Sequence, residues 1–125
     1  MLQNAPMFAY IPVSDLARAR KFYEEKLGFK PDQVMEGGVS YNCADGTAFF
    51  MYPSAGAGTS QASQAFWRVK DVRAEVAELR DLGVVFEEYD NPEYGTVDGI
   101  ATGGGAMTAW FKDTEGNILA ISQPA

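Results

Sequence analysis

The chain has 125 residues, enough for one modest hydrophobic core, and its hydrophobic content of 46% excludes a disordered protein. A net charge of −7 argues against electrostatic binding of nucleic acid or of an anionic membrane, and no apolar run reaches membrane-spanning length. Histidine is absent and Cys43 is the single cysteine, which excludes His-based catalysis, His metal ligands and an intrachain disulfide. The N-terminus has no signal-peptide pattern, so we expect a cytoplasmic protein.

The first predicted elements are a strand and an amphipathic helix. Along residues 8–13, positions 8, 10 and 12 would face one side of a strand and positions 9, 11 and 13 the other, and both sets are largely apolar. This pattern predicts a strand buried on two faces. Ser14 or Asp15 is expected to cap the helix that follows, and Gly28 to end it. The helix has one apolar face, formed by Leu16, Ala19, Phe22, Tyr23 and Leu27. Beyond it, residues 39–43 and 47–52 flank an Ala-Asp-Gly turn, which predicts a β-hairpin.

The same pattern returns after a linker rich in Ser, Ala and Gly over residues 53–63. Residues 65–69 predict a strand, Asp71 a helix cap and Gly83 a helix end. Val-Ser-Asp-Leu at 13–16 matches Val-Lys-Asp-Val at 69–72, and Leu-Gly-Phe at 27–29 matches Leu-Gly-Val at 82–84. The chain therefore contains two copies of one strand–helix–strands module. We expect the copies to pack together, because neither would bury a large core alone.

Residues 91–107 form the least regular segment of the sequence and include three consecutive glycines at 103–105. A lone glycine-rich stretch is a weak indication of a phosphate-binding loop. This one lacks the Gly-Lys-Ser/Thr ending and leads into a predicted strand over residues 107–111 instead of a helix. We interpret it as a mobile loop beside a pocket, and the role of residues 99–106 stays open.

Taken together, the motifs resemble the vicinal oxygen chelate superfamily of glyoxalases, bleomycin-resistance proteins and extradiol dioxygenases. Phe-Tyr at 22–23 followed by Leu-Gly-Phe at 27–29 is similar to one signature of that family, and Phe-Lys-Asp-Thr-Glu-Gly-Asn at 111–117 to another. The resemblance implies an α+β fold of two tandem βαβββ modules, about 6–54 and about 62–123, in a single domain over 1–125. The modules would form a cupped mixed sheet with the helices outside. Family members commonly dimerise, so a homodimer is expected.

The resemblance also implies where catalytic relatives hold a divalent metal. The first strand and the last strand of each module would each supply one ligand, and these positions hold Phe8, Phe50, Gln64 and Ala120 here. A divalent cation needs several oxygen or nitrogen donors to offset its desolvation, and only the Gln64 amide could offer one. We therefore predict no metal, no cofactor and no metal-dependent chemistry.

Strand alternation predicts aromatic rings and few polar groups on the surface of the cup. Either Trp110 or Phe111 should point inward. The predicted ligand-binding residues are Phe8, Tyr10, Phe50, Tyr52, Gln64, Phe66, Arg68 and Trp110. Such a surface suits a flat aromatic or cationic small molecule. The alternative is a collapsed cup in which Phe8 and Phe50 are ordinary core residues, Gln64 is a buried amide and Arg68 forms a surface or interface ion pair.

These expectations favour a metal-independent small-molecule binding protein that resembles drug-sequestering proteins of the bleomycin-resistance type, with no catalytic residue assigned. One alternative is a divergent glyoxalase-like lyase or isomerase, or a dioxygenase-like enzyme, of unknown substrate. Its acid–base groups would have to come from Tyr10, Tyr52, Arg68 and Asp98. A third possibility is a scaffold that associates through open sheet edges.

Overall fold

The structure is a computed structural model of the chain that describes residues 1–93 and 95–124. It contains two compact units. Unit 1 comprises Met1–Ser60 together with Thr114–Asn117, and unit 2 comprises Gln61–Asp113 together with Ile118–Ala125. The short segment 114–117 thus belongs to unit 1, although the chain on either side of it belongs to unit 2.

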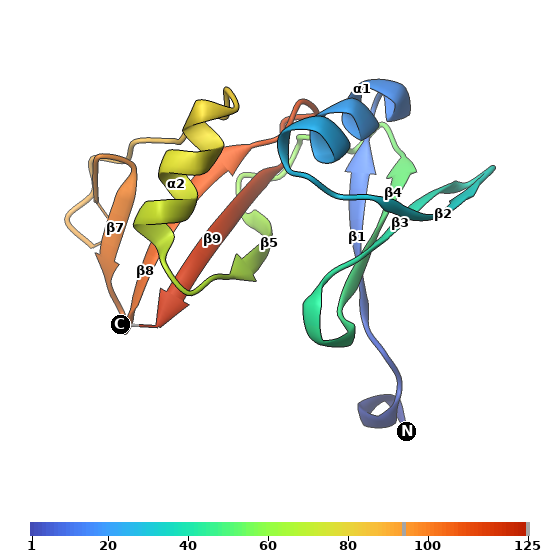
Figure 1. The fold of residues 1–125 in the computed structure, drawn as a ribbon, viewed down its shortest axis with the longest axis horizontal. Coiled ribbons are helices and arrows are strands. Elements are labelled where there is room, and N and C mark those ends of the chain that lie inside the picture. Colours follow the sequence, from blue (N-terminus) through green and yellow to red (C-terminus); the bar gives the residue numbers. More distant parts are fainter. Residues whose placement is uncertain (94, 125) are drawn as a thin grey trace. The chain divides into compact units, whose positions relative to one another are not determined.

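Unit 1 is a mixed sheet with one face covered by a helix (Figure 1). Its strands are ordered β1-β4-β3-β2, with β1 parallel to β4 and the other pairs antiparallel. In chain order the elements are η1 (Leu2–Asn4), β1 (Phe8–Val13), α1 (Leu16–Lys21), the π-helical turn η2 (Phe22–Lys26), β2 (Pro31–Met35), β3 (Gly38–Asn42), η3 (Ala44–Gly46) and β4 (Ala48–Pro53).

The helix cap and the hairpin predicted for unit 1 are confirmed, but the prediction that β1 is buried on two faces is wrong. Phe8 and Tyr10 on one face are largely exposed, whereas Ile11 and Val13 on the other face are buried. The Asp15 carboxylate accepts a hydrogen bond of 3.0 Å from the backbone N–H of Arg18, so Asp15 is the helix cap. The hairpin forms between β3 and β4, and the left-handed backbone of Asp45 and Gly46, with φ of 58° and 77°, makes its turn. One turn of the helix is π-helical, which the apolar spacing did not indicate.

The core of unit 1 lies between α1–η2 and the sheet. One set of alternating positions on β1 and β4, which includes Ile11, Val13 and Met51, is almost fully buried there. Tyr41 stacks on Phe49 with ring centroids 5.0 Å apart, and its hydroxyl donates to the Glu24 carboxylate at 2.8 Å. Burial, with this hydrogen bond, raises the pKa of Tyr41 above its ordinary value. The side chain is therefore a neutral part of the core.

Unit 2 is a second mixed sheet with strand order β5-β9-β8-β7-β6. Its elements are β5 (Ser63–Arg68), α2 (Val72–Asp81), β6 (Thr96–Val97), β7 (Ile100–Gly103), β8 (Ala106–Lys112) and β9 (Ile118–Pro124). Asp71 caps α2 as predicted, because its carboxylate accepts from the N–H of Ala74 at 3.1 Å. The short strand β6 is an addition to the expected βαβββ order. The α+β class is confirmed by both units.

The glycine-rich segment corrects the expectation of a mobile loop. Residues 100–103 and 106–112 pair as the antiparallel hairpin β7–β8, and Gly104 and Gly105 form its turn with φ of 63° and 82°. Two consecutive residues with positive φ suit the twist of a tight hairpin, and glycine adopts that backbone without strain. The consecutive glycines at 103–105 therefore serve a hairpin turn, which was not predicted from the sequence.

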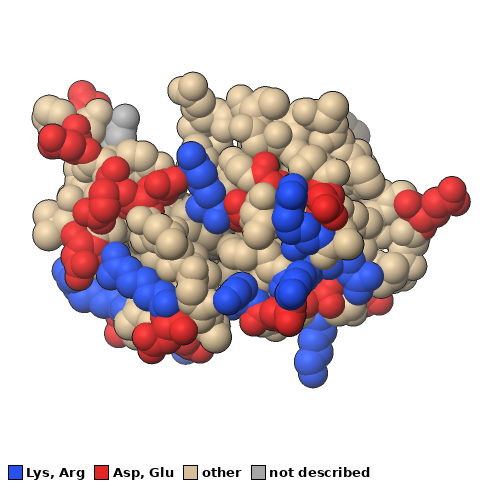
Figure 2. Space-filling model, turned by 90° about the horizontal axis from the view of Figure 1, so that it is seen from above, with Lys and Arg blue, Asp and Glu red and all other residues tan. Residues whose placement is uncertain are grey.

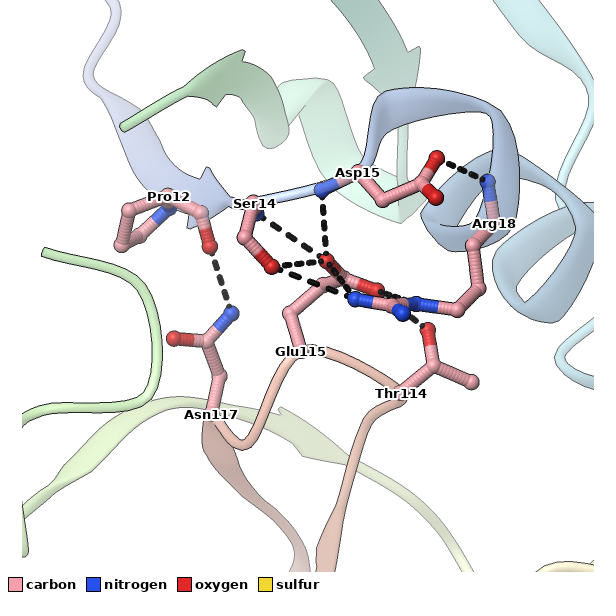
Figure 3. Close-up of polar contacts among 7 residues, drawn as sticks. All are labelled: Pro12, Ser14, Asp15, Arg18, Thr114, Glu115 and Asn117. Carbon is pink, nitrogen blue, oxygen red and sulfur yellow. Dashed lines mark hydrogen bonds and ion pairs between the residues drawn. The ribbon is translucent and has the colours of Figure 1, made fainter. Parts of the chain in front are cut away.

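The segment 114–117 is held in unit 1 by buried polar contacts (Figure 3). Oε1 of Glu115 accepts hydrogen bonds from the Ser14 N–H at 3.0 Å, the Ser14 hydroxyl at 2.9 Å and the Asp15 N–H at 2.9 Å. Arg18 binds both carboxylate oxygens, at 2.9 and 3.0 Å. The Asn117 amide donates to the Pro12 carbonyl at 2.8 Å. We call residues 114–117 the Glu115 turn.

These contacts decide the ionisation of Glu115. Burial of the carboxyl group favours its neutral form, but hydrogen bonds from Arg18, Thr114, Asp15 and Ser14 outweigh burial and lower the pKa of Glu115 to about 2. A carboxylate so weakly basic, with its oxygens occupied by donors, is unsuited to proton transfer near neutral pH. The Glu115 turn is therefore a structural anchor.

Among residues 1–93 and 95–124, no helix combines the length and apolar character needed to cross a bilayer. Figure 2 shows Lys and Arg side chains beside Asp and Glu side chains on the face viewed. Charges of both signs are thus interspersed there, despite the net charge of −7.

Candidate functional site

Four aromatic side chains share the face of unit 1 that the helix leaves uncovered. The parallel register pairs Tyr10 with Phe50 and Pro12 with Tyr52, and Phe8 lies two positions before Tyr10 on the same side of β1. Tyr10 is central: its ring meets Phe50 edge-on at 5.9 Å and Tyr52 edge-on at 5.0 Å between centroids. We call Phe8, Tyr10, Phe50 and Tyr52 the aromatic face of unit 1.

This face is hollowed and exposed. A cavity of about 250 Å³ is lined by Phe8, Ala9, Tyr10 and Phe50. Phe8 is 51% exposed and Tyr10 is 68% exposed, whereas the opposite face of the same strand is buried. Large aromatic groups left in water cost hydrophobic free energy that burial would recover. In this structure Phe8 and Tyr10 are surface residues and do not pack as core.

The side chains at the positions where the resemblance implies metal ligands do not fit a divalent cation. Phe8 and Phe50 place rings against the cavity, and Ala120 on β9 is almost fully buried and has no donor atom in its side chain. Over the part of the chain that the structure describes, no three His, Cys, Asp or Glu side chains lie close enough to hold a metal ion. The donor set that metal chemistry in this family needs is lacking at these positions.

The uncovered face of unit 2 carries two rows of side chains across the edge strand β5 and its neighbours β9 and β8. Register pairs Phe66 on β5 with Ala120 on β9, and Ala120 with Trp110 on β8, which makes an aromatic row. The next row along the strands is polar: Arg68, Ser122 and Thr108. We call these the aromatic row and the polar row of unit 2.

Trp110 belongs to the uncovered face, which resolves the choice between Trp110 and Phe111. Phe111 is almost fully buried and stacks on Trp67 with centroids 6.4 Å apart. The Trp110 indole N–H donates to the Ser63 hydroxyl at 3.1 Å, and Tyr89 meets the Trp110 ring edge-on at 5.5 Å. Trp110 is thereby held in one orientation with part of its ring accessible.

Gln64 does not follow the expected alternation. The pairing of β5 with β9 shifts between Ser63 and Ala65, which is a β-bulge at Gln64. The polar group that accepts the hydrogen bond from Trp110 is therefore the Ser63 hydroxyl, where the expected alternation had placed the Gln64 amide on this face. Three hydroxyl residues of this face were not predicted from the sequence: Ser63, Thr108 and Ser122. Short polar residues in a strand carry no distinctive signal until the register is known.

Within neither unit, taken by itself, do the acid–base candidates among the described residues form a catalytic pair. Tyr10 and Tyr52 lie on unit 1, and no described carboxylate of that unit makes a hydrogen bond to either of them. Asp98 occupies the β6–β7 turn in unit 2, where its carboxylate forms an ion pair with Arg80 of α2 at 3.3 Å. Asp98 thus links the β6–β7 hairpin to α2 through an ion pair.

Comparisons with known proteins agree with the fold. The family model described as Glyoxalase/Bleomycin resistance protein/Dioxygenase superfamily matches residues 5–121. No curated protein sequence matches the chain significantly.

Several solved structures share the fold at low sequence identity. TnmS3, an antibiotic binding protein from Streptomyces sp. CB03234, has a TM-score of 0.66 and 24% identity, with 100% of this chain and 99% of that chain covered. Lactoylglutathione lyase from Agrobacterium tumefaciens has a TM-score of 0.70 and 15% identity over 96% and 93% of the two chains. A glyoxalase/bleomycin resistance protein/dioxygenase from Alicyclobacillus acidocaldarius has 0.71 and 18%, over 97% and 92%. With the family model matching almost the whole length, the chain belongs to the glyoxalase/bleomycin resistance protein/dioxygenase superfamily.

Proposed function

We propose that the protein is a metal-independent binding protein for planar aromatic small molecules, similar to the drug-sequestering members of its superfamily. The observation that carries the proposal is the cavity of about 250 Å³ walled by Phe8, Tyr10 and Phe50. A flat ring that entered it would bury the exposed parts of Phe8 and Tyr10 and could meet their rings edge-on or offset. Each such aromatic contact contributes about 0.5–1.5 kcal/mol beyond area burial.

The antibiotic-binding description of TnmS3 supports a ligand of this class, since that protein shares the fold over the full chain. A cationic ring is compatible with the aromatic face of unit 1, because the faces of Phe and Tyr rings attract cations. On unit 1 we also assign Tyr52 to ligand binding. The residues that we propose for ligand binding on unit 2, considered by itself, are Gln64, Phe66, Arg68 and Trp110. We also propose a cytoplasmic homodimer, which light scattering and cell fractionation would test.

The test uses three compounds of matched size: naphthalene-2-methanol, 2-naphthylmethylammonium and the saturated decahydronaphthalene-2-methanol. We expect calorimetry to detect binding of the two naphthyl compounds and at least tenfold weaker binding of the saturated one, which cannot stack. If no naphthyl compound binds, or if the saturated compound binds as well, the proposal is wrong.

Variants of Tyr10 assign the site. Tyr10→Ala should weaken binding of naphthalene-2-methanol about five- to tenfold, and Tyr10→Phe, which keeps the ring, should leave it within twofold. Val34→Ala is the matched control, because Val34 is an exposed apolar residue on β2 and lies outside the aromatic face. If Tyr10→Ala and Val34→Ala lowered the affinity equally, the aromatic face of unit 1 would not be the binding site.

A further inference from the structure

The polar row of unit 2 contains a cation with no carboxylate to neutralise it. Arg18, Arg20 and Arg80 each form an ion pair with a Glu or Asp side chain. Arg68 forms none with any carboxylate of the described residues, and its side chain is exposed at the end of β5. Its register neighbour on β9 is Ser122, so the residue next to it on this face is a neutral hydroxyl.

One of the two hydroxyl groups in the polar row can donate a hydrogen bond outside the row. Thr108 Oγ1 and Ser122 Oγ lie 3.1 Å apart, and either atom could be the donor. A hydrogen bond between two hydroxyls uses one O–H as donor and leaves the other O–H free to donate elsewhere. The row therefore presents a guanidinium with five N–H donors beside a hydroxyl donor, a combination that suits an oxygen acceptor.

An aromatic surface lies one row away. Phe66 is 60% exposed, and it precedes Arg68 by two residues on the same side of β5. Side chains at that spacing lie about 6.6 Å apart along a strand, and adjacent strands are about 4.8 Å apart. A fused two-ring compound on Phe66 and Trp110 could therefore extend an attached oxygen group to Arg68.

We infer that the ligand is a planar aromatic compound that carries an oxygen acceptor, with a carboxylate as the best match, and that Arg68 with Ser122 binds this group. The inference rests on the proposed function and narrows it, because it selects an anionic aromatic over a cationic one. The net charge of −7 opposes an anion at long range. Exposed charges beyond about 8 Å are largely screened at physiological salt, so the local guanidinium determines the contact.

The experiment compares 2-naphthoate with 2-naphthylmethylammonium, which share one ring system and differ in the sign of the charge. Calorimetry on the wild-type chain should show about tenfold tighter binding of 2-naphthoate. Arg68→Gln should lower the affinity for 2-naphthoate about tenfold, as expected for loss of a charge-assisted hydrogen bond. It should leave the affinity for the ammonium compound unchanged or slightly raised. Arg68→Lys, which keeps the charge without the fork, should lie between.

Two controls separate a local contact from general electrostatics or misfolding. Arg73→Gln removes an exposed arginine from the first turn of α2 and should leave both affinities within twofold. In a Trp67→Phe background, the remaining Trp110 fluorescence should be quenched by 2-naphthoate, because Trp110 lies on the aromatic row. Far-UV circular dichroism verifies that each variant is folded.

The outcomes distinguish this inference from the proposed function. If the ammonium compound binds more tightly, or if Arg68→Gln and Arg73→Gln have equal effects, the anionic class is wrong. The proposed function would still stand if Tyr10→Ala weakened binding. If 2-naphthoate binds through Arg68 but is insensitive to Tyr10→Ala, the inference holds and the aromatic face of unit 1 is not the site. If neither 2-naphthoate nor 2-naphthylmethylammonium binds, the inference is wrong, and the proposed function is overturned as well only if naphthalene-2-methanol also fails to bind.

Discussion

The two ends of β1 in unit 1 have opposite chemistry. At its C-terminal end, the Glu115 turn buries a carboxylate and surrounds it with donors from Ser14, Asp15 and Arg18. At its N-terminal end, Phe8 and Tyr10 are large apolar groups exposed to solvent beside a cavity. Proteins usually bury apolar side chains and expose polar ones. The two ends of β1 show the reverse, with a buried carboxylate at one end and exposed aromatic rings at the other. The comparison indicates that the polar end maintains the fold and that the apolar end is available for a ligand.

The largest expected effect is on stability, from Glu115→Ala. The substitution removes the hydrogen-bond acceptor of the Ser14 and Asp15 N–H groups and the ion-pair partner of Arg18. We expect the free energy of unfolding to fall by about 3 kcal/mol, measured by urea denaturation. Glu25→Ala, which removes an exposed carboxylate from η2, is the control and should change it by less than about 0.5 kcal/mol. Equal effects would contradict the anchor role.

The same carboxylate predicts a pH dependence. The pKa of Glu115 is lowered from 4.5 to about 2 on folding, so its stabilisation is complete above pH 4.5 and is lost as pH falls towards 2. The maximum contribution is about 3 kcal/mol. Urea denaturation of Glu115→Gln should show a shallower loss of stability over this range than the wild type. Parallel curves would show that the carboxylate is not responsible.

Gly58 tests how closely the Glu115 turn packs. A Cβ at Gly58 would clash with the carbonyl oxygen of Glu115, and the φ of Gly58 is +71°. Gly46 has a similar φ of +77° but nothing within 4 Å of its Cβ position. Gly46→Ala should therefore cost about 1 kcal/mol of backbone strain, and Gly58→Ala about 2 kcal/mol or more, because a backbone clash is added. If both variants lowered the melting temperature equally, the backbone at residue 58 would be adjusting to the added Cβ at little cost.

The smallest expected effect on stability comes from the other end of β1. Phe8→Ala removes a half-exposed ring, so the free energy of unfolding should change by less than about 1 kcal/mol. The same variant should weaken binding of naphthalene-2-methanol about fivefold, because Phe8 lines the cavity. Urea denaturation and calorimetry on one preparation measure both quantities. A large loss of stability would make Phe8 a core residue and weaken the comparison.

The sequence was most informative where a local rule acts. The helix caps at Asp15 and Asp71 and the Asp-Gly hairpin follow from capping and turn rules, and the structure confirms them. The expected burial of both faces of β1 was wrong, because apolar alternation does not specify whether a second layer covers each face. Ring orientation on β1 and β4 was predictable because regular strands alternate.

The errors occur where tertiary pairing decides. The bulge at Gln64 depends on how β5 pairs with β9, which no residue of β5 specifies alone. The choice between Trp110 and Phe111 was left open by the sequence, although Trp110 was the residue assigned, because it depended on the packing of Phe111 against Trp67 and Phe86. Glu115 belonged to a recognised motif, but its partners near Ser14 are about a hundred positions away in the chain, beyond the reach of any local pattern.

The membership of the Glu115 turn has a consequence for separating the duplicated halves. Unit 1 is completed by four residues that are encoded far downstream, within the second repeat. A truncated protein that stops at Ser60 would contain every strand of its sheet and still lack the carboxylate that satisfies the start of α1. The two repeats of the sequence are therefore not equivalent, because residues of the second repeat complete the fold of the first.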